Sequence, residues 1–388
     1  MNDTPKKIIV SGVTGQDGSY MVDYLLANTL HQVYGMIRRT AKPDYSNLAG
    51  ALNHPRFQFV NGDLSDTTSL DNVVRQVGPD YFINLAAQSF VKESWNTPEQ
   101  TFDVDAMGVL RCLEAIRKHA PLCKFYNAGS SEEHGDVAYV PQDEKHPLRP
   151  RSPYGAAKAA ARHIVKVYRE SYGLYAVQGI LFNHEGSRRG KEFVTRKITQ
   201  GVARIAAAIK AGQPFEPIEL GNLDAKRDWS DARDFVDGIW RMLNQDVYRP
   251  DRYEVLGGVV ASHDPDNPRR SSKLMSQWIN EYVLASGETH TVREFVEKAF
   301  ATAGIRGTWA FHGEPKDHCP ENEVYLAPAD TSFATLVRVN PVFYRPAEVD
   351  LLLGNPTRAR TELGWSPKIL FDQLVAEMVK SDLAAVGL

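Results

Sequence analysis

The chain has 388 residues, of which 43% are hydrophobic and 24% are charged, and its formal net charge is -3. This is the composition of a globular chain with one large or two modest domains, and it provides no overall basic field for nucleic acid. The three cysteines, Cys112, Cys123 and Cys319, lack metal-ligand spacing and favour a reducing compartment. No signal-peptide pattern and no apolar run of about 18 residues is found. We expect a soluble cytoplasmic protein with no metal, membrane or nucleic-acid partner.

The first motif is a strand, a glycine-rich turn and a helix. Residues 8–10 predict a buried strand and residues 19–28 predict a helix. Between them, Gly12, Gly15 and Gly18 have the spacing G-x-x-G-x-x-G. Glycine permits a tight turn and lets a pyrophosphate approach the N-terminus of the helix. This context favours a dinucleotide site over glycines that only form a turn.

Two arginines follow the second predicted strand, residues 33–37. A site that prefers NAD usually has an acidic residue here, which holds the ribose 2′-hydroxyl. Arg38 and Arg39 instead suit a 2′-phosphate, because a guanidinium fork matches phosphate oxygens. The sequence therefore favours NADP as the cofactor, with a solvated loop pair as the alternative.

Further strands alternate with helices along the first half of the chain. Residues 57–60, 81–85, 124–128 and 176–181 predict strands, and residues 101–119 and 154–172 predict helices. This alternation predicts an α/β fold with a doubly wound parallel sheet, which binds ligands beyond the carboxyl ends of its strands. Residues at these ends include Asp63, which is placed to meet an adenine or to cap a helix, and the small Ala86 and Ala87.

A tyrosine and a lysine lie on one face of the predicted helix 154–172. Ser152 suits its N-cap and Pro153 its first turn. Tyr154 and Lys158 are four residues apart and so share a face. A lysine ammonium beside a phenol lowers the phenol pKa, which suits proton exchange with a sugar hydroxyl near neutral pH. The alternative is a half-buried tyrosine beside a solvated lysine.

The second half of the chain is less regular. Residues 231–243, 291–303 and 371–383 predict helices, and residues 282–285 predict a strand. The polar segment 248–281 contains proline and charge but little periodicity, and we interpret it as a surface insertion.

Six motifs together resemble the extended short-chain dehydrogenase/reductases, and within them the GDP-mannose 4,6-dehydratase family. Two of them, GVTGQDGSY (12–20) and PRSPYGAAK (150–158), are general to the superfamily. Four are more particular: GILFNHE (179–185), FVTRKI (193–198), GNLDAKRDW (221–229) and YRPAEVD (344–350). The resemblance covers nearly the whole chain apart from the insertion. It implies a Rossmann NADP-binding domain of residues 1–182 and 228–287, and a smaller, discontinuous α/β domain for a GDP-sugar, of residues 183–227 and 288–388.

The resemblance also implies the roles of the catalytic residues. Tyr154 would be the base for sugar oxidation, and Lys158 would lower its pKa and hold the nicotinamide ribose. Glu132 would remove the C5 proton and help water to leave C6. Ser130 stands where the family usually has threonine, and its hydroxyl keeps the hydrogen bond.

Three neighbours depart further from the family pattern. Gly129, Glu133 and His134 replace the usual Ser, Leu and Tyr, and this leaves the identity of the sugar open.

The resemblance assigns the remaining site residues to two groups. The cofactor group consists of Gly12, Thr14, Gly15, Gln16, Asp17, Gly18, Arg38, Asp63, Leu64, Leu85, Ala86, Ala87, Ser89, Tyr154, Lys158, His184 and Arg189, the last near the cofactor phosphates and a subunit contact. The substrate group consists of Ser89, Glu132, Asn183, Lys197, Arg227, Arg345 and Glu348.

The implied reaction converts GDP-mannose to GDP-4-keto-6-deoxymannose with tightly bound NADP. The alternatives are a GDP-heptose 4,6-dehydratase, or a GDP-sugar epimerase or 4-reductase on the same fold. An epimerase needs no elimination at C6, so the presence of Glu132 favours dehydration. A non-catalytic NADP-binding protein would be expected to have lost Tyr154, Lys158 or Glu132. The family also implies a homodimer or a homotetramer.

Overall fold

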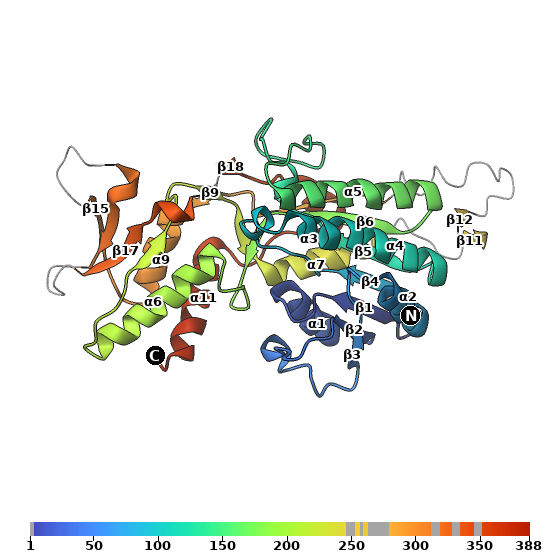
Figure 1. The fold of residues 1–388 in the computed structure, drawn as a ribbon, viewed down its shortest axis with the longest axis horizontal. Helices are drawn as coiled ribbons and strands as arrows, with labels where there is room; N and C mark the ends of the chain where they lie inside the picture. The colour runs from blue at the N-terminus through green and yellow to red at the C-terminus, as the bar shows by residue number, and fades with distance from the viewer. Residues whose placement is uncertain are drawn as a thin grey trace.

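The computed structural model has two lobes, which lie side by side along the long axis of the molecule (Figure 1). It describes residues 4–245, 253–256, 259–262, 279–311, 319–327, 334–344 and 351–388. The larger lobe contains both the N-terminal half of the chain and several later segments. Most of the predicted insertion 248–281 lies outside the described residues. Its described part includes an antiparallel pair of strands, β11 (Tyr253–Leu256) and β12 (Val259–Ser262).

A seven-stranded sheet forms the centre of the larger lobe, in the order β13-β6-β5-β4-β1-β2-β3. Every pairing in it is parallel. The fold class predicted from the sequence is therefore confirmed. The strands are β1 (Lys7–Ser11), β2 (Gln32–Ile37), β3 (Phe57–Asn61), β4 (Tyr81–Asn84), β5 (Lys124–Ala128), β6 (Ala176–Leu181) and β13 (Val283–Leu284).

Helices pack on both faces of this sheet. They are α1 (Gln16–Asn28), α2 (Thr67–Val77), α3 (Pro98–Phe102), α4 (Gly108–His119), α5 (Pro153–Tyr172), α7 (Ala232–Leu243) and α10 (Thr357–Leu363). Helix α1 packs against α7, whereas α2, α4 and α5 pack together. The predicted helix 101–119 is interrupted by a π-helical turn, Asp103–Met107, which separates α3 from α4.

Helix α5 begins and ends as its sequence predicts. The Ser152 hydroxyl accepts a hydrogen bond from the Gly155 backbone N–H at 3.0 Å, and Pro153 occupies the first turn. Gly173 follows the helix with a φ of 67°, the left-handed conformation that glycine adopts at least cost. The cap fixes Tyr154 in the first turn, at the carboxyl end of the sheet.

The smaller lobe has a four-stranded sheet in the order β15-β16-β17-β8, covered by three helices. Its elements are α6 (Val194–Lys210), β8 (Ile218–Leu220), α9 (Val292–Thr302), β15 (Thr308–Phe311), β16 (Glu323–Leu326), β17 (Thr335–Val339) and α11 (Phe371–Ala385). Short strands lie where the chain passes between the lobes: β7 (Asn183–Glu185), β9 (Lys226–Arg227), β10 (Trp229–Asp231), β14 (His290–Thr291) and β18 (Leu351–Leu352). Neither α6 nor these short strands were predicted.

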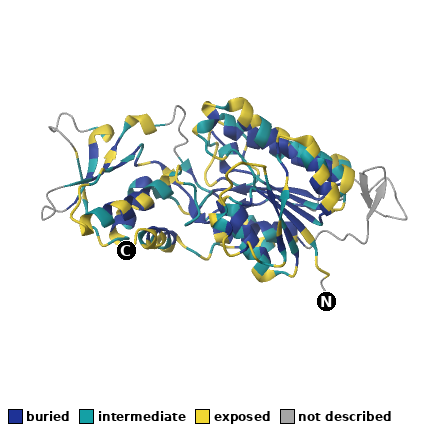
Figure 2. Cartoon of the chain, turned by 60° about the horizontal axis from the view of Figure 1, so that its bottom comes forward, coloured by how far each residue is buried: buried dark blue, intermediate teal, exposed yellow. Residues whose placement is uncertain are grey.

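Two large hydrophobic clusters correspond to the two lobes. One surrounds the seven-stranded sheet, and the other is built mainly from α6, α9, α11 and the smaller sheet. Buried residues concentrate on the strands and on the inward faces of the helices (Figure 2). The predicted domain boundaries stay a prediction, which the two cores support, although Ala359 and Trp365 pack in the first core.

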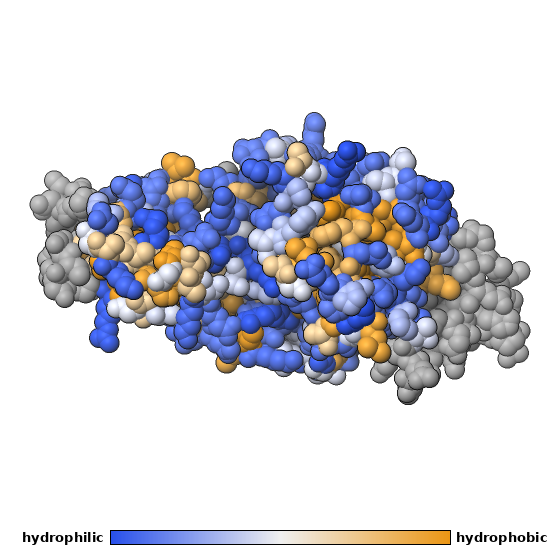
Figure 3. Space-filling model, turned by 90° about the horizontal axis from the view of Figure 1, so that it is seen from below, coloured by the Kyte–Doolittle hydropathy of each residue, from blue (hydrophilic) through white to orange (hydrophobic). Residues whose placement is uncertain are grey.

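The surface gives two further observations. The face seen in Figure 3 is mostly hydrophilic and carries a broad apolar area on the larger lobe. Among the described residues, no helix combines the length and apolar character needed to cross a membrane.

Candidate active site

A cavity of about 1220 Å³ lies at the carboxyl ends of the central strands. Residues of both lobes line it, including Lys197 on α6 and Leu220 on β8. Every predicted site residue that the structure describes lines this cavity. Arg345 and Glu348 lie outside the described residues, so their assignment stays a prediction.

The glycine-rich turn leaves room for a phosphate group. Gly12 has a φ of 63°, and a Cβ atom there would lie 2.7 Å from the Ala86 nitrogen. A Cβ atom at Gly18 would lie 2.2 Å from the Gly12 carbonyl oxygen. At Gly15, the N-cap of α1, a Cβ atom would approach only that same oxygen, at 3.3 Å, and would otherwise extend into the open cavity. The turn therefore fits a pyrophosphate at the N-terminus of the helix.

A partly buried ion pair lies next to this turn. The imidazole Nε2 of His184 is 2.8 Å from Asp17 Oδ2, and its Nδ1 is 2.7 Å from the Phe182 carbonyl oxygen. Burial alone would raise the pKa of Asp17, but the charge and hydrogen bond of His184 lower it. The same pair raises the pKa of His184 despite its burial. The pair ties the first turn of α1 to β7.

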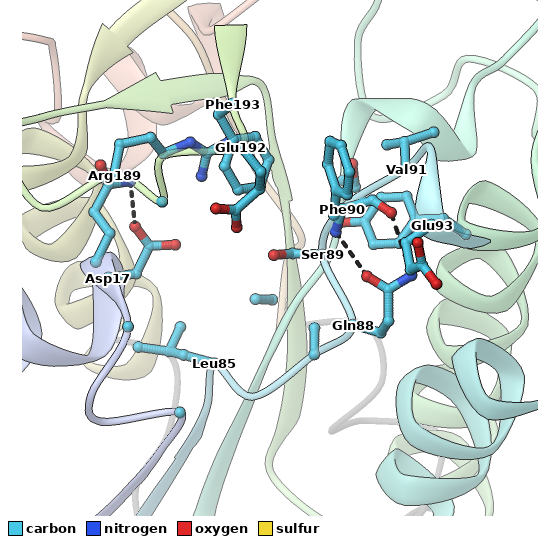
Figure 4. A pocket seen from close by; sticks show the side chains of 18 of the residues that line it. Asp17, Leu85, Gln88, Ser89, Phe90, Val91, Glu93, Arg189, Glu192 and Phe193 are labelled. Atoms are coloured by element: carbon cyan, nitrogen blue, oxygen red, sulfur yellow. Dashed lines mark hydrogen bonds between the residues drawn. The ribbon is translucent and has the colours of Figure 1, made fainter. Parts of the chain in front are cut away.

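Two walls of the cavity face one another across this region (Figure 4). Asp17 and Arg189 lie on one side, and Gln88, Ser89 and Phe90 lie on the other. Arg189 Nε is 3.1 Å from Glu185 Oε2, and its guanidinium lies 3.6 Å from the centre of the Phe193 ring.

Tyr154 and Lys158 lie at the base of the cavity, but they do not interact as predicted. Lys158 Nζ donates a hydrogen bond of 3.0 Å to the Ala128 carbonyl oxygen and is 5.7 Å from the centre of the Tyr154 ring. Burial raises the pKa of Tyr154, and Asp105 adds to the rise, while a hydrogen bond with Ser130 opposes it. The net pKa of Tyr154 is therefore raised in this structure, and the lowering effect of Lys158 stays a prediction. The phenol is only 8% exposed, and burial of the phenolate outweighs a lysine at this distance.

Asp105 is a carboxylate near this pair that the sequence did not single out. It lies in the π-helical turn and is 1% exposed. Its Oδ1 accepts a hydrogen bond of 2.7 Å from the Gln88 N–H, and its Oδ2 has no hydrogen-bond partner among the described residues. Burial raises its pKa from 3.8 to about 6, and the Lys158 charge opposes that rise. The only feature of the sequence that marks Asp105 is its place as the second acidic residue of the D-x-D pattern at 103–105.

Asp105→Asn is expected to change both stability and the pH profile. An acid with a raised folded-state pKa loses stability as the pH rises through about 4 to 6, because its ionised form is disfavoured in the fold. Removing the charge should stabilise the protein at pH 7 by up to about 3 kcal/mol. It should also lower the pKa of Tyr154, and so move the acid limb of kcat/KM to lower pH. Thermal unfolding and a pH–rate profile measure these two effects.

Asp103→Asn is the matched control for that experiment. Asp103 lies in the same π-helical turn but forms a half-exposed ion pair of 2.7 Å with Arg111. We expect the Asp103→Asn variant to have the same pH–rate profile as the original protein. An Asp105→Asn variant with the profile of the original protein would contradict the role given to the Asp105 charge.

Ser130 and Glu132 lie opposite Tyr154 in a short helical turn after β5, Ser131–Glu133. The Ser130 hydroxyl accepts a hydrogen bond of 3.2 Å from the Glu132 N–H, which fixes the start of the turn. The Glu132 charge contributes to the raised pKa of Tyr154, so the carboxylate and the phenol are close enough to interact. The structure thus brings two proton-transfer groups to one cavity from different elements.

The smaller lobe contributes polar and aromatic groups. Lys197 Nζ lies 3.4 Å from the centre of the Phe343 ring, and Lys92 Nζ lies 5.4 Å from it on the other lobe. Asn183 Oδ1 is buried without a hydrogen-bond partner among the described residues. The Arg227 side chain is largely buried in β9. Phe343 and Lys92 were not predicted, because only the tertiary fold brings them to the cavity.

The parallel sheet, the glycine-rich turn and the cavity at the strand ends are those of a Rossmann dinucleotide-binding fold. A family model described as GDP-mannose 4,6 dehydratase matches residues 9–267 and 262–378. The GDP-mannose 4,6-dehydratase of Vibrio cholerae is 41% identical over 386 residues, which covers 97% of this chain and 94% of that protein. The chain belongs to the GDP-mannose 4,6 dehydratase family.

Two solved structures show the same fold at lower identity. A dTDP-glucose 4,6-dehydratase from Streptomyces venezuelae, with NAD and TYD bound, has a TM-score of 0.72 at 21% identity and covers 97% of this chain and 96% of its own. RMD from Pseudomonas aeruginosa, complexed with NADPH, has a TM-score of 0.66 at 20% identity. The match covers 98% of this chain and 100% of that chain.

Proposed function

We propose that this protein is a GDP-mannose 4,6-dehydratase, which forms GDP-4-keto-6-deoxymannose and water. The observation that carries the proposal is the meeting of Tyr154 and Glu132 at one cavity, with Ser130 between them in the hydrogen-bond pattern. Oxidation at C4 and elimination across C5 and C6 need two proton-transfer groups, because one side chain cannot reach both the C4 hydroxyl proton and the C5 proton.

The residues have separate tasks in this proposal. Tyr154 takes the proton of the C4 hydroxyl, aided by Ser130. The resulting C4 ketone acidifies the C5 proton, which Glu132 removes. Glu132 then gives a proton to the C6 hydroxyl, which leaves as water. A nicotinamide cofactor, when bound, would supply the acceptor for the C4 hydride and the donor of that hydride to C6 after water has left, so it is not consumed.

The glycine-rich turn and the open space at Gly15 support a nicotinamide dinucleotide in this cavity. We propose NADP rather than NAD because the exposed Arg38 lines the cavity beyond β2, where a 2′-phosphate would be held. The cavity is also lined by His184, Asp17 and Arg189.

Arg38→Ala is expected to weaken NADP binding by about 10- to 100-fold and to leave NAD binding nearly unchanged, because a charge-assisted hydrogen bond is worth about 1.5–3 kcal/mol. Calorimetric titration of each nucleotide measures this difference. Arg39→Ala is the matched control, since Arg39 is exposed next to Arg38 but does not line the cavity. An equal loss of both nucleotides in Arg38→Ala would argue against recognition of the 2′-phosphate.

The direct test of the function is incubation of the purified protein with GDP-mannose and mass spectrometry of the product. We expect a product lighter by one water, with no net consumption of reduced cofactor. GDP-heptoses are tested in parallel, because the hydroxyl pattern of the sugar is the finer question. An unchanged mass for every GDP-hexose and GDP-heptose would refute dehydratase activity.

We also propose a homodimer or homotetramer. Phe102, Met107 and Val167 are large apolar side chains with exposed fractions of 44%, 38% and 52%. Phe102 and Met107 belong to α3 and the π-helical turn, which pack against the helix that carries Val167. An apolar surface of this kind suits a subunit contact. Light scattering after size exclusion should give a mass of two or four chains, whereas a monomer at micromolar concentration would contradict the proposal.

A further inference from the structure

A second carboxylate lies directly behind the catalytic turn. Glu133 is fully buried, and its Oε1 accepts hydrogen bonds of 2.8 Å from the Ser130 N–H and 2.8 Å from Gln178 Nε2. With the Ser130 hydroxyl, it forms a capping box around the turn. Glu133 thus contacts Ser130 from the side away from the cavity, and it does not line the cavity itself.

The residue before Ser130 makes room for this carboxylate. A Cβ atom at Gly129 would lie 2.5 Å from the Gly179 carbonyl oxygen, 2.6 Å from Glu133 Oε1 and 2.7 Å from Gln178 Nε2. Any larger residue at position 129 would therefore have to displace the β6 backbone as well as Glu133 or Gln178. Gly129 and Glu133, which both depart from the family pattern, lie in direct contact.

The charges around Glu133 come from α5 and from the segment before β13. Arg162 Nη1 is 3.9 Å from Glu133 Oε2, and the same guanidinium pairs with Glu281 at 2.9 Å. Arg169 also pairs with Glu281, at 3.2 Å. Burial raises the pKa of Glu133 to about 7. Arg162, the hydrogen bond from the Ser130 N–H and Lys158 oppose this rise, and Glu281 adds to it.

Oε1 of Glu133 accepts two hydrogen bonds, whereas Oε2 has no hydrogen-bond partner among the described residues. The proton of a neutral Glu133 would therefore be placed on Oε2. Oε1 then remains an acceptor for Ser130 in both protonation states.

We propose that Glu133 is a positioning residue, whose Oε1 atom fixes the Ser130 backbone and so orients the Ser130 hydroxyl and Glu132 toward Tyr154. The inference rests on the proposed function, because it assigns Glu133 to the same reaction. Ser130 connects Glu133 to both proton-transfer groups. Its hydroxyl accepts a hydrogen bond from the Glu132 N–H and forms a hydrogen bond with the Tyr154 phenol. A small displacement of Ser130 would move both proton-transfer groups out of line.

The test compares Glu133→Leu, which removes the acceptor, with Glu133→Gln, which keeps it. We expect kcat with GDP-mannose to fall about 10- to 100-fold in Glu133→Leu with little change in KM, because misplacement affects the chemical step more than binding. Glu133→Gln should restore kcat to within about threefold of the original protein.

Amide hydrogen exchange of the peptide containing Ser130 is the second readout, and it needs no substrate. Loss of the Glu133 acceptor should speed exchange of the Ser130 N–H in Glu133→Leu but not in Glu133→Gln. If Glu133→Leu does not fold, Glu133→Asp replaces it. Aspartate is one methylene shorter, so its carboxylate should fail to reach Ser130 and should give the same two effects.

Glu281→Gln is the control for general destabilisation. It weakens the buried ion pairs of Arg162 and Arg169, but Glu281 makes no contact with Ser130. We expect a lower melting temperature and a nearly unchanged kcat.

A Glu133→Leu or Glu133→Asp variant with the kcat of the original protein would overturn the inference, as would a Glu133→Gln variant as slow as Glu133→Leu. Unchanged exchange of the Ser130 amide in Glu133→Leu would also overturn it. If the original protein itself does not dehydrate any GDP-sugar, the proposed function fails, and the exchange experiment still decides whether Glu133 anchors Ser130.

Discussion

Glu132→Gln is expected to abolish loss of water from the sugar while the protein still binds its cofactor. The amide has nearly the shape of the carboxylate but cannot accept the C5 proton, so the rate should fall by about 10²- to 10⁴-fold or more. Oxidation at C4 depends on Tyr154 and should persist. The reduced nicotinamide should therefore accumulate in a single turnover, which its absorbance measures, and mass spectrometry should show no dehydrated product.

Glu93→Gln is the matched control, because Glu93 also lines the cavity but is not among the charges that act on Tyr154. We expect its product and rate to resemble those of the original protein. Full dehydratase activity in Glu132→Gln would transfer the acid/base role to another group.

Tyr154→Phe should stop the reaction one step earlier. Without the phenol no group accepts the proton of the C4 hydroxyl, so we expect a loss of kcat of about 10²- to 10⁴-fold and no reduced nicotinamide in a single turnover. The fold should survive, because the ring remains and only the hydrogen bond with Ser130 is lost, at a cost of about 1 kcal/mol. Single-turnover absorbance distinguishes this variant from Glu132→Gln.

Tyr126→Phe serves as the control for removing a buried phenol. Tyr126 is fully buried on β5, and its hydroxyl has no hydrogen-bond partner in the part of the chain that the structure describes. The variant should keep its activity and be at least as stable as the original, because no satisfied hydrogen bond is lost. Reduced nicotinamide forming at the usual rate in Tyr154→Phe would contradict the role of Tyr154.

The sequence predicted the larger lobe better than the smaller one. Its strands are short apolar runs between turn signals, as in residues 8–10 and 176–181, and both lie in the parallel sheet. In the smaller lobe, strands such as β9 and β14 contain two residues each. So short a strand has no recognisable period, and only its partner across the lobe defines it.

Local spacing was enough to predict the glycine turn before α1, the capped start of α5 and the placement of Tyr154 and Lys158 on one helical face. Each of these depends on backbone geometry within a few residues. The tertiary structure decided what these groups experience. Burial and the distant Asp105 raise the pKa of Tyr154, and Lys158 bonds to a carbonyl group instead of the phenol. Electrostatics depends on desolvation and on charges brought together by the fold, which spacing along the chain cannot specify.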